Sequence, residues 1–332
     1  MEVAQQVVRV AERSQAGDAR RAALSIARRI GFDESDAGRV GLVVTEAATN
    51  LVKHAKDGEI VLSAVQEQGR SELRILAMDQ GPGIGRLEES LRDGVSSTGT
   101  AGNGLGAIRR SSTEFDIYTG ANGTIVYSMI SSDVPVRDQL LSGAICAPRQ
   151  GESACGDGFA IDHRSPVTTV LVVDGLGHGP GAAEAAEAAL ASFRAHPGDS
   201  PADALDRMGG FLRRTRGAAA AVARLDRGNR VVRFSGIGNI AGVVLSETDP
   251  TRHMVTDHGI VGQTSRTPHE YDYPLPPRFS MVLHSDGIGA RWKLETYPGL
   301  LRRHPMLSAG AIFRDFRRPT DDATVVVLRE AA

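Results

Sequence analysis

The stretch from Val170 to Gly179, Val-Leu-Val-Val-Asp-Gly-Leu-Gly-His-Gly, most constrains how the C-terminal half of this chain can fold. Its apolar beginning is rich in β-branched residues, which pack well on a pleated sheet, so it predicts a buried strand. The strand ends at Asp174, and the alanine-rich segment 181–195 that follows reads as a helix. A carboxylate at a strand end, beside backbone freed by glycine, suits a hard cation held by oxygen ligands. A plain strand-to-helix turn with an aspartate cap explains this one motif equally well.

Three further acids of the same half share this setting. Asp157, Asp286 and Asp321 each lie at the edge of a predicted strand, beside glycine or another aspartate. Acids drawn from distant parts of the chain to one end of a sheet sandwich would repel one another unless cations neutralised them. Oxygen-only ligands select Mg²⁺ or Mn²⁺ over zinc, and two such ions about 3.5–4 Å apart form the usual clamp for hydrolysing a phosphate ester.

Composition narrows the class of protein. A chain of 332 residues is long enough for two domains with separate cores, and its 38 glycines fit a fold with many tight turns. Its net charge of −2 provides no basic surface for binding nucleic acid. No apolar run reaches the roughly 18 residues of a membrane span, and the charged N-terminus does not resemble a signal peptide, so we expect a cytoplasmic protein without membrane contact. Cys146 and Cys155 lack zinc-ligand spacing and cannot make a disulfide framework, so we expect small half-buried side chains.

In the first half, helices are predicted at 18–30 and 33–55. In the second helix, Glu46, Asn50 and His54 repeat at four-residue steps beside an apolar stripe, so they line one face. Such a polar row marks either a solvated flank or the wall of a site. Strands are predicted at 59–65, 72–78, 114–118 and 124–130.

Two glycine-rich stretches accompany this helix. Asp79-Gln-Gly-Pro-Gly83 follows a strand, and the loop 94–106 contains five glycines and runs into a helix that begins near Leu105. Glycines before a helix N-terminus expose backbone N–H groups and the positive end of the helix dipole, which suits phosphate. A single glycine-rich loop is equally typical of a flexible linker, whereas the motifs together are more specific.

These motifs resemble those of the GHKL ATPase superfamily, in particular the RsbT-like anti-sigma and switch-protein serine kinases, over roughly residues 1–130. The resemblance implies that Asn50 holds the Mg²⁺ of bound ATP, that Glu46 orients or deprotonates the attacking hydroxyl, and that Asp79 accepts from the adenine amino group. A carboxylate and an amide one helical turn apart can serve as base and Mg²⁺ ligand. For Lys53, a phosphate contact and a solvated helix face stay equally open. The glycines expected to bind the nucleotide are Gly81, Gly83, Gly102, Gly104 and Gly106.

The polar, proline-containing stretch 133–139 separates the halves, so we predict an ATP-binding domain at 1–132 and a second domain at 140–330. The second half reads as many strands with two helices inside the run, which predicts a β-sandwich with helical outer layers. Two further helices are predicted at 294–303 and 309–317, before the last strand. The fold class expected for the chain is therefore α+β, with an α/β sandwich of the GHKL type before this sandwich.

The second half resembles the PPM family of metal-dependent Ser/Thr protein phosphatases, in its RsbX-like stress-response branch, over about 140–329. The resemblance implies two Mn²⁺ or Mg²⁺ ions bridged by Asp174. One ion is expected to bind Asp157 and the carbonyl oxygen of Gly175 as well, and the other Asp286 and Asp321. The motifs that carry the resemblance are Ala154-Cys-Gly-Asp157-Gly-Phe, Asp174-Gly-Leu-Gly-His-Gly, Ser285-Asp286-Gly and Asp321-Asp322-Ala-Thr.

The sequence departs from this family at several points. Eukaryotic members place a phosphate-binding arginine shortly before the first acid, where this chain has serine and alanine at 153–154, and a histidine two residues after the bridging acid, where it has Leu176. The sequence therefore leaves open which residue binds the phosphate and which one protonates the leaving group. His178 is either that acid or a structural residue at a helix start, and Asp322 is an alternative ligand to Asp321.

Together the resemblances imply a bifunctional regulator in a partner-switching pathway. The first domain is expected to bind, and to phosphorylate, a small regulatory protein such as a STAS-type antagonist or a sigma factor, and the second to remove phosphate from Ser or Thr of such a protein. No helical segment with a phosphoacceptor histidine is visible, which argues against a sensor histidine kinase. The alternative is a nucleotide-gated binding module that sequesters its partner without phosphotransfer. A homodimer stays open because related ATP domains often pair.

Overall fold

The computed structural model describes residues 2–67, 69–91, 104–133, 140–263 and 267–331. The chain folds into two compact units, which are described separately: the first comprises Met1–Arg137 and Leu294–Arg314, the second Asp138–Lys293 and Asp315–Ala332. Both units combine helices with antiparallel sheets, so the predicted α+β class is confirmed. Among the described residues, no helix has the length and apolar character that a membrane crossing requires.

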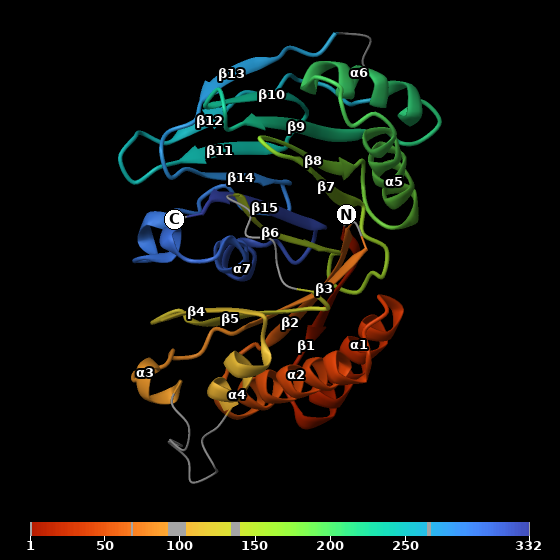
Figure 1. The fold of residues 1–332 in the computed structure, drawn as a ribbon. Helices are drawn as coiled ribbons and strands as arrows, with labels where there is room; N and C mark the ends of the chain where they lie inside the picture. The colour runs from red at the N-terminus through yellow and green to blue at the C-terminus, as the bar shows by residue number, and fades with distance from the viewer. Residues whose placement is uncertain (1, 68, 92–103, 134–139, 264–266, 332) are drawn as a thin grey trace. The chain divides into compact units, whose positions relative to one another are not determined.

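The first unit is built on a five-stranded antiparallel sheet in the order β1-β2-β3-β5-β4 (Figure 1). Helices α1, α2 and α4 cover one face of this sheet. The bounds of its elements are β1 Glu2–Arg9, α1 Arg13–Arg29, α2 Glu34–His54, β2 Glu59–Glu67, β3 Arg70–Met78, α3 Leu87–Ser90, α4 Gly104–Ser111, β4 Glu114–Gly120 and β5 Gly123–Ser131.

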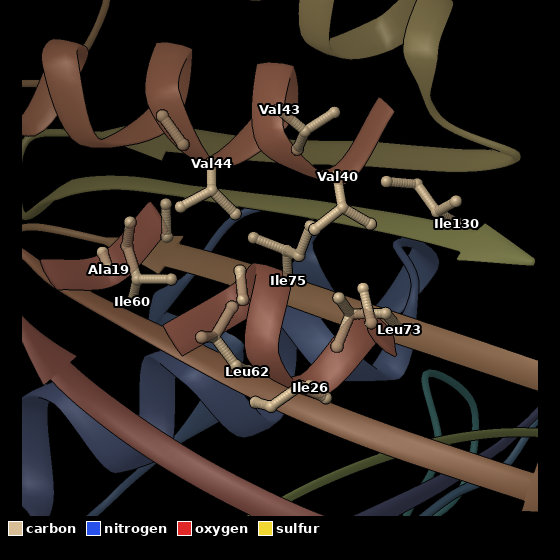
Figure 2. Close-up of a cluster of buried hydrophobic side chains, with 14 of the residues drawn as sticks. Ala19, Ile26, Val40, Val43, Val44, Ile60, Leu62, Leu73, Ile75 and Ile130 are labelled. Carbon is tan, nitrogen blue, oxygen red and sulfur yellow. The ribbon is translucent and has the colours of Figure 1, made fainter. Parts of the chain in front are cut away.

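The core of this unit lies between α2 and the sheet. Val40, Val43 and Val44 repeat at helical spacing on α2 and are fully buried against Leu62 and Ile75 of β2 and β3, as Figure 2 shows. Burial of each such side chain contributes roughly 1.5–3 kcal/mol, so this stripe fixes the rotation of α2 about its axis. The polar row of α2, Glu46, Asn50 and His54, lies beside this stripe and is therefore held at a fixed position relative to the sheet.

The opposite face of the same sheet is covered by a segment from far along the chain. It contains the 3₁₀ turns η1 (Leu294–Thr296) and η2 (Leu300–Arg302) and most of helix α7 (Pro305–Phe316). A Cβ atom on Gly310 of α7 would lie 3.0 Å from the Leu76 side chain and 3.2 Å from that of Ile125, so the helix backbone sits close on β3 and β5. The packing thus groups this segment with the first unit, whereas the predicted domain boundaries place it in the second domain.

The second unit is a sandwich of two five-stranded antiparallel sheets, in the orders β13-β10-β9-β8-β7 and β12-β11-β14-β15-β6. Apolar residues of both sheets form the core between them, and helices α5 and α6 cover the outer face of the first sheet. The bounds are β6 Leu140–Ala147, β7 Asp157–Arg164, β8 Val167–Gly175, α5 Pro180–Ala195, α6 Pro201–Leu212, β9 Ala218–Asp226, β10 Val231–Ile237, β11 Ala241–Leu245, β12 Arg252–Met254, β13 Tyr271–Pro274, β14 Ser280–His284 and β15 Ala323–Glu330.

A few elements differ from the sequence prediction. Strands β1 and β13 were not predicted, because each is an edge strand in which polar residues interrupt the apolar pattern. The predicted helix at 294–303 is two short 3₁₀ turns instead, since Pro298 and Gly299, with a φ of 76°, prevent a continuous helix.

Candidate functional site

The four predicted acids of the second unit lie at neighbouring strand ends. Asp157 opens β7 and stands opposite Asp174 near the end of β8 in the antiparallel register. Asp286 follows β14 by two residues, Asp321 precedes β15 by two, and these two strands are also paired. The side chain of Asp174 is hydrogen-bonded with that of Asp286 and feels the charges of Asp157 and Asp321. The tertiary structure therefore brings the four carboxyl groups together.

The electrostatics of this acidic cluster show what it could bind. Burial, followed by the charges of the neighbouring acids, raises the pKa of Asp174 to about 9. Burial also raises the pKa of Asp157 and, together with the charge of Asp286, that of Asp321. These carboxylates destabilise one another, so a positive charge placed among them would be stabilised. Within the described part of the chain, no three His, Cys, Asp or Glu side chains are grouped tightly enough to form a ready-made metal cage.

Two polar residues for which no role was predicted support these acids. The hydroxyl of Ser285, which is fully buried, donates to Asp157 Oδ2 at 2.6 Å and accepts from the Thr324 N–H at 3.0 Å. Asn239 Nδ2 donates to Asp286 Oδ2 at 2.7 Å. The only signals for these residues were positional: Ser285 is adjacent to Asp286, and Asn239 ends a Gly-Ile-Gly-Asn turn after a strand.

The neighbouring residues Asp321 and Asp322 have different environments. Asp322 is 2% exposed, and its two carboxylate oxygens accept from the N–H groups of Arg149 and Gly156, each at 2.8 Å. Asp321 is half-buried, and after burial the charge of Asp286 contributes most to the raised pKa of its carboxyl group. Asp322 is thus engaged with backbone, whereas Asp321 belongs to the acidic cluster.

The glycines after Asp174 allow a close turn into α5. A Cβ atom on Gly175 would lie 2.2 Å from the carbonyl oxygen of Ala182, so no larger residue fits there. Beside this turn, His178 Nδ1 lies 2.8 Å from Glu152 Oε1, and Arg149 Nε lies 3.0 Å from the same oxygen. Leu176, at the position of the family's histidine, is exposed. Glu152 therefore holds His178 at the turn before α5, a role that was not predicted.

In the first unit, the polar row of α2 meets the start of α4. A Cβ atom on Gly104, the first residue of α4, would lie 3.2 Å from Glu46 Oε2 and 3.3 Å from Asn50 Oδ1. Glu46 and Asn50 are half-buried, whereas Lys53 and His54 are exposed. Three of the predicted residues thus converge. Of the other lid glycines, Gly106 is buried in α4 and Gly102 lies outside the described residues.

The turn after β3 carries Asp79. Its N–H donates to the Thr124 carbonyl at 3.0 Å, and its Oδ1 accepts from the Gly81 N–H at 2.6 Å. Burial raises the pKa of Asp79, although hydrogen bonds from Gly81 and Thr124 and the charge of Arg314 oppose that rise. The side chain is therefore fixed by its own turn and is poised as an acceptor.

Gly83 provides a test of this turn. Its φ is +78°, and a Cβ atom there would lie 2.3 Å from the Gly120 carbonyl oxygen, whereas nothing lies within 4 Å of a Cβ on Gly85. We expect Gly83→Ala to destabilise the turn by about 1–3 kcal/mol or more and to weaken nucleotide binding, because both the backbone and the contact become strained. Gly85→Ala is the matched control. Thermal unfolding and titration with a fluorescent nucleotide measure both effects, and equal behaviour of the two variants would contradict the assigned geometry.

Two protein-family models match the chain, one in each half. Residues 10–129 match the histidine kinase-like ATPase domain, and residues 166–330 match the stage II sporulation protein E (SpoIIE) family. The serine/threonine-protein kinase RsbT of Bacillus subtilis is 34% identical over 99 residues, which are 30% of this chain and 74% of RsbT. The phosphoserine phosphatase RsbX of the same organism is 23% identical over 145 residues, covering 42% of this chain and 70% of RsbX.

Two solved structures have a similar fold over part of the chain. A chain from work on the bacterial stressosome, a modular system adapted to control secondary messenger signaling, matches with a TM-score of 0.54 at 30% identity, over 58% of this chain and 100% of that one. RsbX in complex with magnesium matches with a TM-score of 0.53 at 17% identity, over 59% of this chain and 97% of RsbX, which shows a shared fold. The chain therefore belongs to the RsbT-like family of histidine kinase-like ATPases through its N-terminal domain and carries, after it, a SpoIIE-type phosphatase domain related to RsbX.

Proposed function

We propose that the C-terminal domain removes phosphate from phosphoserine or phosphothreonine of a regulatory protein with the help of two Mn²⁺ or Mg²⁺ ions. The observation that carries this proposal is the convergence of Asp157, Asp174, Asp286 and Asp321 at neighbouring strand ends. An all-carboxylate oxygen donor set whose members destabilise one another fits hard divalent cations.

In this proposal the chain's own residues position the reaction. Asp174 would contribute to holding both ions, Asp157 and the Gly175 carbonyl would help to hold one, and Asp286 and Asp321 would help to hold the other. When bound, such ions polarise the phosphate ester and activate water for attack on phosphorus. Ser285 and Asn239 hold Asp157 and Asp286 in place through their hydrogen bonds. His178, oriented by Glu152, is the candidate that protonates the leaving serine or threonine oxygen.

For the N-terminal domain we propose Mg·ATP binding and phosphorylation of a small cytoplasmic regulatory protein, a STAS-type antagonist or a sigma-factor-like partner. Asn50 would hold Mg²⁺, Glu46 would act on the attacking hydroxyl, and Asp79 would accept from adenine. The approach of Gly104 to both Glu46 and Asn50 supports this assignment. Pull-down with and without ATP, followed by mapping of the modified residue, would identify the partner.

Paired variants at Asp321 and Asp322 test the metal assignment. We expect Asp321→Ala to lower Mn²⁺ affinity and phosphatase activity at least about tenfold with little loss of stability, because its carboxylate faces the other acids. Asp322→Ala leaves two N–H groups unpaired and should cost about 2–5 kcal/mol of stability. Calorimetric Mn²⁺ titration and urea unfolding followed by the fluorescence of Trp292, the single tryptophan, separate the two outcomes. Unchanged Mn²⁺ affinity in Asp321→Ala would overturn its role as a ligand.

A further inference from the structure

Two thiols lie together beside the acidic cluster. Cys146 on β6 and Cys155 before β7 are not joined in a disulfide; both are half-buried, and their Sγ atoms are 3.6 Å apart. The Cys146 thiol also lies 3.5 Å from the carbonyl oxygen of Asp157, to which it donates. A disulfide needs an S–S distance of about 2.05 Å, so the two sulfur atoms would have to approach by about 1.5 Å. In reducing compartments, the disulfides that do form are usually transient and catalytic or redox-sensing.

We propose that Cys146 and Cys155 are a site of reversible oxidation by peroxide. One thiol is oxidised to a sulfenic acid as the peroxide O–O bond breaks and one water leaves. The second sulfur then attacks this sulfenic sulfur, the S–S bond forms, the S–O bond breaks, and a second water leaves. The two thiols together lose two electrons and two protons, and the peroxide is reduced to water.

The disulfide would disturb Asp157. It removes the thiol hydrogen bond to the Asp157 carbonyl and draws the Cys146 sulfur toward Cys155. The loop between the cysteines cannot simply follow, because Asp322 holds the N–H groups of Arg149 and Gly156. We therefore expect oxidation to weaken Mn²⁺ binding, a consequence that rests on the proposed role of Asp157 as a ligand.

The test compares the reduced full-length chain before and after treatment with hydrogen peroxide. We expect titratable thiols to fall from two per chain to none, the linked cysteine peptides to lose about 2 Da, and dithiothreitol to restore both. Phosphatase activity should fall at least about fivefold and recover on reduction, whereas Cys146→Ser should keep its activity under peroxide.

The possible outcomes distinguish the oxidation site itself from its effect on Asp157. Thiols that stay titratable, or peptides that gain oxygen without linking, would overturn the oxidation site. A disulfide that leaves Mn²⁺ affinity and activity unchanged would overturn its effect on Asp157. Absence of phosphatase activity in reduced and oxidised protein alike would instead reject the proposed function, while the mass measurement still decides the disulfide.

A different set of contacts ties the segment Leu294–Arg314 to the nucleotide motif of the first unit. The Arg314 side chain, 8% exposed, donates from Nη1 to the Asp79 carbonyl oxygen at 2.9 Å, and Gln80 Nε2 donates to the Arg314 carbonyl at 3.4 Å. The turn that carries Asp79 is therefore linked to α7 in both directions.

The rest of the segment is anchored on the same sheet. The imidazole of His304 stacks on the ring of Tyr127, with centroids 4.1 Å apart, and both residues are buried. Asp116 accepts from the His304 N–H at 2.8 Å and pairs with Arg303 at 3.2 Å. These contacts bury an ionisable and an aromatic side chain together, so the segment is specifically docked.

In sequence, this segment joins Asp286 to Asp321. Within the second unit, the chain on its two sides is paired, because the Gly289 N–H donates to the Phe316 carbonyl at 2.8 Å and the Arg318 N–H to the Gly287 carbonyl at 2.7 Å. A displacement of the segment would therefore act on this paired stretch, which leads to Asp286 on one side and to Asp321 on the other.

We infer that nucleotide binding at the Asp79 turn changes the phosphatase activity through the segment Leu294–Arg314. This inference rests on the proposed function of both domains. A ligand can shift the segment only if it binds its two arrangements with different affinity, and couplings of this kind typically change affinity or rate by about 5–150-fold.

Trp292 provides a direct readout, because it lies just before the segment and its indole N–H donates to His284 Nε2 at 3.1 Å. We expect a non-hydrolysable ATP analogue with Mg²⁺ to change Trp292 fluorescence saturably and to change the phosphatase rate at least about fivefold. Arg314→Met and the milder Gln80→Ala should bind the analogue with affinity within about twofold of wild type yet lose both responses.

Three outcomes would contradict different parts of this inference. Analogue binding by calorimetry with no change in fluorescence or rate in the wild type would overturn the coupling alone. Responses that persist in both variants would overturn the route through Arg314. Absence of analogue binding would overturn the coupling together with the proposed function of the N-terminal domain.

Discussion

Asp174→Asn is expected to abolish phosphatase activity, with a loss of at least about a thousandfold, equivalent to about 4 kcal/mol of transition-state stabilisation. Asp174 interacts with each of Asp157, Asp286 and Asp321, and we propose it as the ligand shared by both ions. An amide carries no charge to hold either ion, so Mn²⁺ affinity measured by calorimetry should fall together with the rate of release of phosphate from a phosphoserine protein.

Asp174→Asn is also expected to affect thermal stability, and in the opposite direction. Because burial and neighbouring acids raise the pKa of Asp174 to about 9, its carboxylate form is unfavourable in the metal-free fold. The neutral amide should therefore unfold at the same or higher temperature than wild type without added metal. Asp162→Asn is the matched control, since Asp162 lies on the same β7 strand but pairs with Arg164 outside the acidic cluster. Equal activity of Asp174→Asn and wild type would reject the metal site.

Glu46→Gln is expected to lower phosphotransfer from ATP to the partner by about 10²–10⁴-fold, the usual contribution of a general base. The amide keeps the shape of the side chain beside Gly104 but cannot accept a proton. Nucleotide affinity, measured with a fluorescent ATP analogue, should stay within about threefold of wild type, since Asn50 and Asp79 are unchanged.

The exposed acid Glu34 in the first turn of the same helix provides the control, and Glu34→Gln should behave as wild type. If Glu46→Gln transfers phosphate at the wild-type rate, Glu46 is not the base. If the wild type forms a stable ATP-dependent complex with its partner but transfers no phosphate, the domain is a nucleotide-gated binding module instead.

Local sequence patterns were sufficient for much of the fold. The β-branched run before Asp174 and the valine stripe of α2 are buried as predicted, because period-two and period-3.6 patterns directly encode which side chains face a core. Edge strands such as β1 were missed, since only one side of their backbone is paired and their burial is weak. Pro298 and Gly299 interrupt the predicted helix at 294–303 and leave two 3₁₀ turns, a local effect of these two residue types.

The sequence by itself determined the two domain types and led to the prediction of four candidate metal-binding aspartates, because motifs such as Asp-Gly at a strand end reflect local chemistry. Only the tertiary structure showed that Asp322 accepts from backbone N–H groups, brought Cys146 within 3.6 Å of Cys155, and grouped Leu294–Arg314 with the ATPase sheet. The physical reason is that a side chain's partners come from strands and loops far away in sequence. Neighbouring positions with the same chemistry, such as two adjacent aspartates, acquire different roles only when the packed chain points one at backbone N–H groups and the other at carboxylates.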